Sequence, residues 1–346
     1  MAVKRKLTKA REYQIDLQEA FDDFLDEKKS LNKSEATIKS YQGSFDRFYD
    51  YLEEKKKEAK AAEDSEVKPT SLFTGGTYAE NMNEQVIFMF SNHLLNDEVK
   101  ATSVNHYLRE IRSFFYWCME KELMPQFKIK LIKEEDVIKD TYTDEELAVL
   151  LVKPKKLASV VEWRTWAIEN WIMGTGNRAE TVCNITLGDL DFRRMKIRLR
   201  HTKNATQQII PMSRELSYVL KEFIKMWRYD AGDEDYLFCN IGEEKLTVNA
   251  LKHSVRDYNI KRGVNRTSIH AFRHTFAKKW ILNTGDVFRL QKMLGHRTLE
   301  MTRKYVNMFG DDLKENFETY NPLDRIKKSQ PKRKTIRRNT DTDDWI

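Results

Sequence analysis

Six polar side chains in the second half of the sequence have the chemistry to cut a phosphodiester together. Arginine guanidiniums can each hold two non-bridging phosphate oxygens, a lysine can protonate a leaving alkoxide, and a histidine can donate a hydrogen bond or relay a proton. A tyrosine phenol, whose reference pKa is about 10, can attack phosphorus once neighbouring cations favour its anion. Because the arginines would stabilise the developing charge, this reaction needs neither a metal nor a cofactor. The six side chains are Arg178, Lys203, His270, Arg273, His296 and Tyr305.

Taken one at a time, these residues favour ordinary structural roles. Arg178 alone suggests a salt bridge at a helix start, and Lys203 suggests a solvated lysine in a turn. The tyrosine of "LGHRTLEMTRKYV", Tyr305, would more often be a packing residue than a nucleophile. His270 and His274 have the H-x-x-x-H spacing of some zinc ligands, but no glutamate follows His270 and no third ligand is evident. Only the complete set points to chemistry.

Two predicted elements must position the first members of the set. Arg178 follows "MGTG", whose glycines Gly174 and Gly176 allow a tight turn before a helix. Two alternating or β-branched runs within 195–212 predict a hairpin, with a polar loop of about three to five residues that carries Lys203. Arg178 and Lys203 are therefore expected on a helix start and on a hairpin turn.

Two further elements must position the last members. His270 and Arg273 are spaced i, i+3, which puts both on one face of a helix predicted over 268–283. Gly295 is expected to end the preceding helix. His296 would then follow directly after that helix end.

The first half of the chain predicts helices. Apolar residues recur at helical spacing in 13–28, 37–54 and 101–123. Ser34 is the predicted N-cap of the second helix. The charged stretch 54–80, which contains Pro69 and two glycines, indicates a helix that runs out into a loop.

The second half predicts a separate domain. No helical face continues through "FKIKLIKEEDVIKD", which indicates an extended linker before a larger C-terminal domain. That domain opens with a capped helix at "TDEELAVLL" and continues with helices over 213–227, 248–263 and 286–294. Eight of the fourteen residues from Arg325 to Arg338 are basic, so a disordered tail is expected that either touches DNA or only aids solubility.

The composition bounds the class of protein. The 346 residues suffice for two domains, and an apolar fraction of 40% suffices for a core in each. The net charge of +7 predicts a polyanionic partner, although a lysine-rich solvated surface would give the same excess. Cys118, Cys183 and Cys239 lie far apart among apolar residues, which predicts small core residues in a reducing compartment. Neither a signal peptide nor an apolar run long enough to cross a bilayer is evident, so we expect a cytosolic protein.

The ordered motifs resemble the tyrosine recombinase family, which includes phage integrases and Xer-type site-specific recombinases. "TGNRAETVCNITLGDLDF" is similar to the box of the first arginine, Arg178, and "HTKNATQQIIPM" is similar to the family's hairpin with its lysine, Lys203. "HAFRHTFA" is similar to the H-x-x-R box, and in "LGHRTLEMTRKYV" Tyr305 follows His296 by nine residues, as in the final box. The resemblance covers roughly residues 14–325, and the last two boxes are its most specific part.

The resemblance implies a mainly α fold with a small antiparallel β-sheet in the catalytic domain (α+β), arranged as a C-shaped clamp around duplex DNA. A SAM-like helical core-binding domain would span 1–130, followed by a linker over 131–140 and the catalytic domain over 141–325. A basic tail would occupy 326–346. The end of the catalytic domain, 308–326, would form an amphipathic helix that docks on a neighbouring protomer; packing on its own domain is the alternative.

The resemblance also implies a mechanism. Tyr305 would attack the scissile phosphate within its own protomer, form a 3′-phosphotyrosyl link and free a 5′-hydroxyl. Lys203 would protonate the leaving oxygen, and His270 would take the tyrosine proton. The residues expected to stabilise the pentacovalent phosphate are Arg178, Arg273 and His296.

The implied partners are duplex DNA with specific core sites, a homotetramer on two such sites, and an accessory directionality factor, with no membrane involved. Strands would be exchanged through a Holliday junction without ATP or metal. We expect integration and excision or transposition of a mobile element, with chromosome dimer resolution as the alternative, in the cytoplasm of a prokaryote. The helical pattern begins near Tyr13, which leaves no room for an arm-binding domain and favours a simpler recombinase.

The sequence departs from the family pattern at two places. The family usually carries an acidic residue three positions after the first arginine, where this chain has Thr181, with Glu180 one residue earlier. The loop at 54–80 is also longer than in compact members. Two other functions stay open: a type IB topoisomerase, which uses the same chemistry as a monomer on arbitrary DNA, and a non-catalytic DNA-binding relative. The complete residue set argues against the second.

Overall fold

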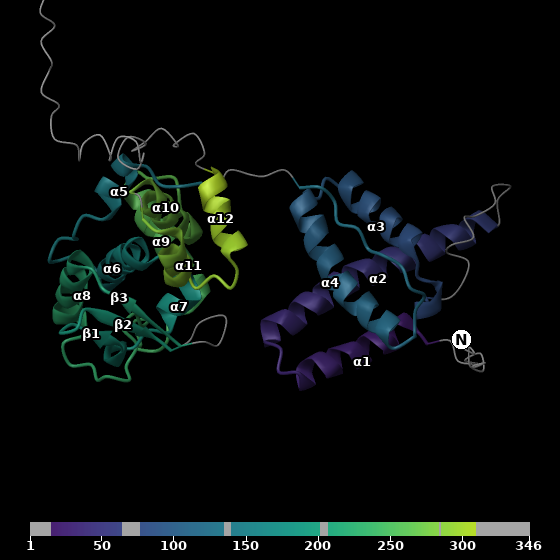
Figure 1. The fold of residues 1–346 in the computed structure, drawn as a ribbon, viewed down its shortest axis with the longest axis horizontal. Helices are drawn as coiled ribbons and strands as arrows, with labels where there is room; N and C mark the ends of the chain where they lie inside the picture. Colours follow the sequence, from purple (N-terminus) through teal and green to yellow (C-terminus); the bar gives the residue numbers. More distant parts are fainter. Residues whose placement is uncertain (1–14, 64–76, 135–139, 201–206, 284, 309–346) are drawn as a thin grey trace, which may run out of the picture. The chain divides into compact units, whose positions relative to one another are not determined.

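The chain forms two compact units that divide between Asp136 and Val137, each with its own apolar core (Figure 1). The computed structural model describes residues 15–63, 77–134, 140–200, 207–283 and 285–308. These residues are mainly helical and include a three-stranded antiparallel sheet in the second unit. The predicted fold class is therefore confirmed.

The first unit is helical and built around stacked aromatic rings. Phe21 stacks on Phe45 with ring centroids 3.8 Å apart, and the edge of Phe114 packs against Phe21 at 5.1 Å. The predicted N-cap is confirmed, because the Ser34 hydroxyl accepts a hydrogen bond from the backbone N–H of Thr37 at 3.2 Å. The three predicted helices are present, together with a fourth. The elements are α1 (Leu17–Ser30), α2 (Glu35–Glu63), the 3-10 turn η1 (Ala79–Asn81), α3 (Glu84–Asn96) and α4 (Ala101–Glu120).

The segment after α4 has no regular structure but is fixed to the first unit as far as Glu134. Ile129 is buried in the core of this unit. The side-chain amide of Asn105 donates to the carbonyl of Ile132 and accepts from its N–H, both at 2.8 Å. As predicted, no helix continues through this stretch as far as Glu134, while 135–139 lie outside the described residues.

The second unit contains the predicted hairpin and the predicted helices. Strands β2 (Lys196–Leu199) and β3 (Gln208–Pro211) pair antiparallel, and β1 (Leu190–Asp191) adds a short outer strand. Between Leu199 and Gln208, residues 201–206 lie outside the described residues, including Lys203. The helices are α5 (Asp144–Leu150), α6 (Val160–Thr175), α7 (Ala179–Cys183), α8 (Arg214–Trp227), α9 (Val248–Lys261), α10 (Ile269–Leu282), α11 (Val287–Leu294) and α12 (Leu299–Met308), with the 3-10 turn η2 (Leu187–Asp189).

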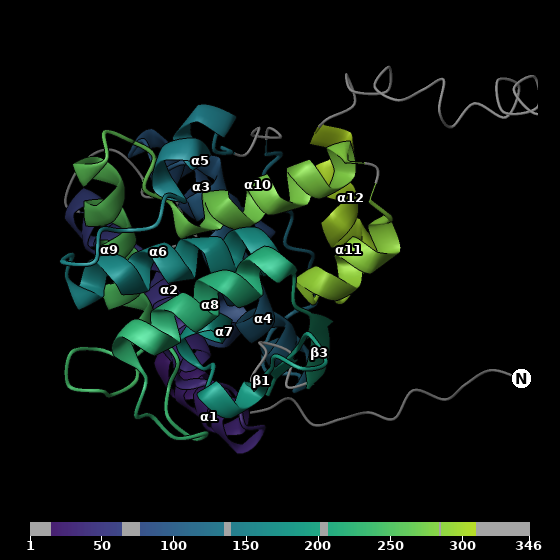
Figure 2. The same ribbon diagram turned by 90° about the vertical axis from the view of Figure 1, so that its left-hand side faces the viewer.

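Helix α6 is the centre of the second unit. It packs against α8, α9 and α10, and Figure 2 shows it running between α8 and α10. Its side chains are buried on nearly all sides, including Trp163, Trp166 and Trp171. A helix that is apolar all round belongs in a core, so α6 holds in place the functional elements that surround it.

The three cysteines and the lengths of the helices can be compared with what the composition predicts. Cys118, Cys183 and Cys239 are all buried free thiols, which confirms their predicted packing role. Among the described residues, the helices lack the combination of length and apolar character that spanning a membrane requires.

One buried carboxyl group in α6 has a predictable effect on stability. Glu169 is fully buried, and neither of its carboxylate oxygens has a hydrogen-bond partner in the part of the chain that the structure describes. Burial raises the pKa of Glu169 well above its usual value, and the charge of Arg262 offsets this only in part. The folded state therefore binds a proton that the unfolded state releases above its own pKa of about 4.5, so stability should fall as pH rises from there toward the folded pKa.

We expect Glu169→Gln to stabilise the protein, and more at pH 8 than at pH 6, because the amide never ionises. The difference should approach about 1 kcal/mol per pH unit until the folded pKa is reached, measured by urea unfolding at both pH values. Glu162→Gln on the same helix is the matched control. Burial raises the pKa of Glu162, but hydrogen bonds from Arg262 and Lys261 outweigh it and lower the pKa overall. The Glu162 variant should gain nothing at either pH; an equal gain there would contradict the explanation.

Candidate active site

Helix α10 buries an arginine against two backbone carbonyls. Ser268 caps the helix, and Phe272 stacks on Tyr142 with ring centroids 4.0 Å apart, which fixes the helix in the core. Arg273 is only 5% exposed, and its guanidinium donates to the carbonyl of Gly176 at 2.6 Å and to that of Leu294 at 2.9 Å. The orientation of this guanidinium is therefore set by backbone atoms of two other segments.

Arg178 reaches the same point from the end of α6. Gly176 ends that helix with a φ of 66°, and an ideal Cβ there would lie 2.5 Å from Phe276, so only glycine fits. Arg178 begins α7 and donates to the carbonyl of Leu294 at 3.3 Å, the same oxygen that Arg273 uses. The predicted turn is confirmed at Gly176, whereas Gly174 lies within α6.

Two guanidiniums thus share one neutral acceptor. Within the described residues neither Arg178 nor Arg273 forms an ion pair with a carboxylate. Burial, and then the charge of Arg178, lower the pKa of Arg273 to about 10. This pKa is still far above neutrality, so both cations remain charged. Such a pair favours an anion with several oxygens.

His296 lies between Arg273 and the start of α12. Gly295 ends α11 with a φ of 61°, as predicted. The Nε2 atom of His296 is 2.9 Å from the guanidinium of Arg273, and its Nδ1 is 2.8 Å from the hydroxyl of Thr302. Because a guanidinium only donates, Nε2 accepts and Nδ1 carries the proton. His296 is thus held in one tautomer by its two neighbours.

Tyr305 is buried beside these groups in its own chain. Helix α12 packs against α10 and α11, and the two views place it beside both (Figures 1 and 2). The Tyr305 side chain is 4% exposed, and its ring lies parallel to that of His296 with centroids 6.2 Å apart. Its hydroxyl is 2.8 Å from Nδ1 of His274 and also hydrogen-bonds to Arg273. The hydroxyl is therefore directed at the cationic cluster.

The electrostatic effect on Tyr305 differs from the simple expectation that the cations favour its anion. Burial raises the pKa of the phenol, while Arg273 and then Arg178 act to lower it. The arginines have the predicted sign, but desolvation is the larger effect. The phenol is therefore protonated at neutral pH, and its proton must move when it reacts.

The other predicted residues lie in different surroundings. His270 begins α10 with an exposed side chain, one helical turn before Arg273. Lys203 lies outside the described residues. Thr181 is buried in α7, while Glu180 is exposed, so the usual acidic neighbour of the first arginine is not supplied by Glu180.

Three contributors to the site are not predicted from the sequence. For His274 the sequence offers only the H-x-x-x-H spacing of a zinc ligand, yet its side chain contacts the Tyr305 hydroxyl. The carbonyls of Gly176 and Leu294 orient the arginines, and a backbone carbonyl has no signature in a sequence. The sequence does contain a signal for His274. This histidine directly follows Arg273 in "HAFRHTFA", so a site built around Arg273 has it close by.

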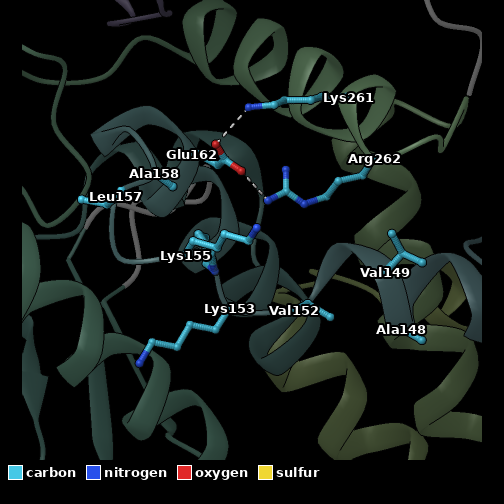
Figure 3. A pocket seen from close by; sticks show the side chains of 11 residues that line it. Ala148, Val149, Val152, Lys153, Lys155, Leu157, Ala158, Glu162, Lys261 and Arg262 are labelled. Carbon is cyan, nitrogen blue, oxygen red and sulfur yellow. Dashed lines mark hydrogen bonds and ion pairs between the residues drawn. The ribbon is translucent and has the colours of Figure 1, made fainter.

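The hollows that the described part of the second unit forms include one beside the cluster and one away from it. A groove of about 710 Å³ borders the cluster, since β3, α11, Gly295 and His296 line it. The second hollow, of about 670 Å³, is shown in Figure 3, and its lining includes no member of the predicted catalytic set. There Glu162 accepts from Arg262 at 2.7 Å and from Lys261 at 3.2 Å, which ties the start of α6 to the end of α9. Of these two hollows, the one lined by Gly295 and His296 borders the active site.

The fold and the site together define a class of enzyme. A buried tyrosine hydroxyl, two imidazoles and two guanidiniums that have no carboxylate partner among the described residues meet on a mainly helical domain. This set fits an enzyme that transfers a phosphodiester to a tyrosine.

Comparison with known proteins identifies the family to which an enzyme of this class belongs. The sequence pattern of the Phage integrase family matches residues 141–310. The chain is 26% identical to the tyrosine recombinase XerC of Staphylococcus aureus (strain JH9) over 312 residues, which cover 88% of this chain and 96% of XerC. The chain belongs to the phage integrase family of tyrosine recombinases, enzymes that cleave and rejoin DNA.

Solved structures show the same fold. The post-cleavage complex of the XerH site-specific recombinase with a palindromic difH substrate has a TM-score of 0.63 at 18% identity, covering 84% of this chain and 82% of XerH. A lambda integrase tetramer bound to a Holliday junction has a TM-score of 0.61 at 13% identity, covering 85% of this chain and 78% of the integrase.

Proposed function

We propose that this protein is a site-specific DNA recombinase whose nucleophile is Tyr305. The observation that carries the proposal is the Tyr305 hydroxyl hydrogen-bonded to Arg273 and next to Arg178, both of which lack a carboxylate partner among the described residues. A scissile phosphate would supply the missing anion. Its two non-bridging oxygens would accept from the two guanidiniums, which places phosphorus beside the phenol.

The proposed reaction conserves the number of phosphodiester bonds. The Tyr305 oxygen attacks phosphorus, the bond to the 5′ oxygen breaks, and a 3′-phosphotyrosyl link forms. Arg178 and Arg273 stabilise the charge on the pentacovalent phosphate, and His296 supports them by holding the Arg273 guanidinium in place. Lys203, which lies between β2 and β3 in the sequence, protonates the leaving oxygen. The 5′-hydroxyl of the partner strand then reverses the step, so no ATP is consumed.

The assembly follows from the same proposal. Each protomer would bind one half-site with both units, 1–130 and 141–325, and four protomers would exchange strands on two DNA sites. The net charge of +7 supports backbone binding. The lambda integrase structure contains a tetramer on a Holliday junction, which supports that intermediate here. Integration, excision or transposition of a mobile element within the nucleoid is the proposed role.

Covalent capture tests the proposed function. Purified protein should form a covalent complex, stable to denaturant, on nicked suicide DNA that carries its core site. Such a core site can be found as inverted repeats flanking the gene. EDTA at millimolar concentration should change the yield by less than about twofold, because the arginines rather than a metal stabilise the charge. Strong inhibition by EDTA would indicate a metal-dependent reaction. Recombination by the purified protein alone would show that no accessory directionality factor is required.

Plasmid relaxation separates the proposal from a type IB topoisomerase. A topoisomerase would relax supercoiled plasmids that lack any core site. A recombinase should relax them far more slowly than plasmids that carry one. Equal rates on both plasmids would favour the topoisomerase.

A further inference from the structure

Two neighbouring side chains of α10 meet the nucleophile in different ways. Consecutive residues of an α-helix project about 100° apart. Arg273 points toward the carbonyls of Gly176 and Leu294, while His274 points toward α12. There Nδ1 of His274 lies 2.8 Å from the hydroxyl of Tyr305, with the two ring centroids 5.6 Å apart.

The direction of that hydrogen bond follows from the donors available. The Tyr305 hydroxyl also hydrogen-bonds to Arg273, and a guanidinium can only donate. The oxygen of Tyr305 therefore accepts from Arg273, and the 2.8 Å contact lets its single proton point at Nδ1 of His274. Nδ1 of His274 accepts that proton when the imidazole is neutral and carries its own proton on Nε2.

His296 and His270, the two histidines of the predicted catalytic set, contact the phenol less directly than His274 does. Nδ1 of His296 faces Thr302 and its Nε2 faces Arg273, so both ring nitrogens have partners other than the phenol. His270 begins α10 with an exposed side chain, whereas His274 is partly buried beside Tyr305. His274 thus has the most direct path to the phenolic proton among the three.

We propose that His274, in place of His270, is the general base that accepts the proton of Tyr305 during cleavage. This inference rests on the proposed role of Tyr305 as nucleophile. As the Tyr305 oxygen bonds to phosphorus, its proton moves to Nδ1 of His274, the bond to the 5′ oxygen breaks, and that oxygen takes its proton from Lys203. On rejoining, the imidazolium of His274 returns the proton to the departing phenolate. Because the phenol is buried, an acceptor already in contact avoids releasing the proton into bulk water.

His274→Asn tests the proposal, because an asparagine oxygen can stand near the Nδ1 position and accept a hydrogen bond but cannot take a proton at neutral pH. Single-turnover cleavage of suicide DNA should fall about 100-fold, while binding of the core site is unchanged. Wild-type cleavage should rise with pH as the neutral imidazole of His274 forms, and this rise should be absent from the variant. The charged and titratable groups around the pair are Arg273 and His270 on α10, Arg178 at the start of α7, His296 before α12, and Tyr305 itself. His253→Asn, an exposed histidine of α9, is the matched control and should keep both rate and profile.

His274→Ala gives a second, independent test. Imidazole added to the buffer should restore part of its cleavage, whereas pyrrole, which has no basic nitrogen, should not. DNA with a bridging 5′-phosphorothiolate, whose leaving group needs no proton, should not restore cleavage by either His274 variant. If that substrate restored cleavage, His274 would act in protonating the leaving group, and the proposal would be wrong.

Three outcomes distinguish the failure of this proposal from failure of the proposed function. If the wild-type protein captures DNA and His274→Asn cleaves within about threefold of it, with the pH dependence intact, His274 is not the base. If His270→Asn removes the pH dependence instead, His270 is the base. If the wild-type protein captures no DNA carrying its core site, both the nucleophile and its base are wrong.

Discussion

Tyr305→Phe is expected to abolish covalent capture on suicide DNA and to leave binding of the core site nearly unchanged. The substitution removes only the hydroxyl, while the ring keeps its place against His296 in a site where it is 4% exposed. The lost hydrogen bonds to His274 and Arg273 should change stability by only about 1 kcal/mol. Denaturing gels measure capture, and band shifts of the same DNA measure binding.

A matched substitution separates the nucleophile from a general effect of losing a hydroxyl. Tyr229 is 78% exposed, so Tyr229→Phe should capture DNA like the wild-type protein. Capture by Tyr305→Phe at more than about one-thousandth of the wild-type rate would mean that another group attacks the phosphate. In that case the arrangement of Arg178 and Arg273 would still describe an anion site, but the reaction assigned to it would be wrong.

The elements that the sequence predicts well are those with one apolar face. The stripes of α1, α2 and α4, the capping residue Ser34 and the alternation of β2 and β3 all leave a periodic signal, and each is found where expected. Helix α6 leaves no such signal, because tryptophans and aliphatic residues surround it on every side. Its burial depends on α8, α9 and α10 closing around it, which is information about tertiary packing rather than local sequence.

The same distinction explains which parts of the site could be predicted. Arg178, Arg273, His296 and Tyr305 belong to recognisable motifs, and the structure brings them together. The polar composition of 294–306 concealed the burial of Tyr305, since that burial comes from packing of α12 on α10 and α11. Proton positions depend on such packing as well, so the base could not be chosen from spacing alone.

Arg273 connects every part of this site. Its guanidinium contacts the carbonyl that ends α6, the carbonyl that ends α11, the ring of His296 and the hydroxyl of Tyr305. Five N–H donors in one plane make these contacts compatible with holding phosphate oxygens, which a single ammonium cannot reproduce. Arg273 therefore has two roles: its charge stabilises the phosphate, and its contacts set the distance between the Tyr305 hydroxyl and the phosphate.

Arg273→Lys should consequently lower single-turnover cleavage by about 10²–10³-fold, the usual loss when one stabilising donor of a transition state is removed. Binding of the core site should weaken much less, because many other contacts to the DNA backbone remain. Arg256→Lys on α9, where the arginine is exposed and pairs with Asp257, is the matched control and should cleave normally. If Arg273→Lys cleaved within about threefold of the wild-type protein, positive charge alone would suffice at this position. The planar geometry that links Gly176, Leu294 and His296 would then be structural rather than catalytic.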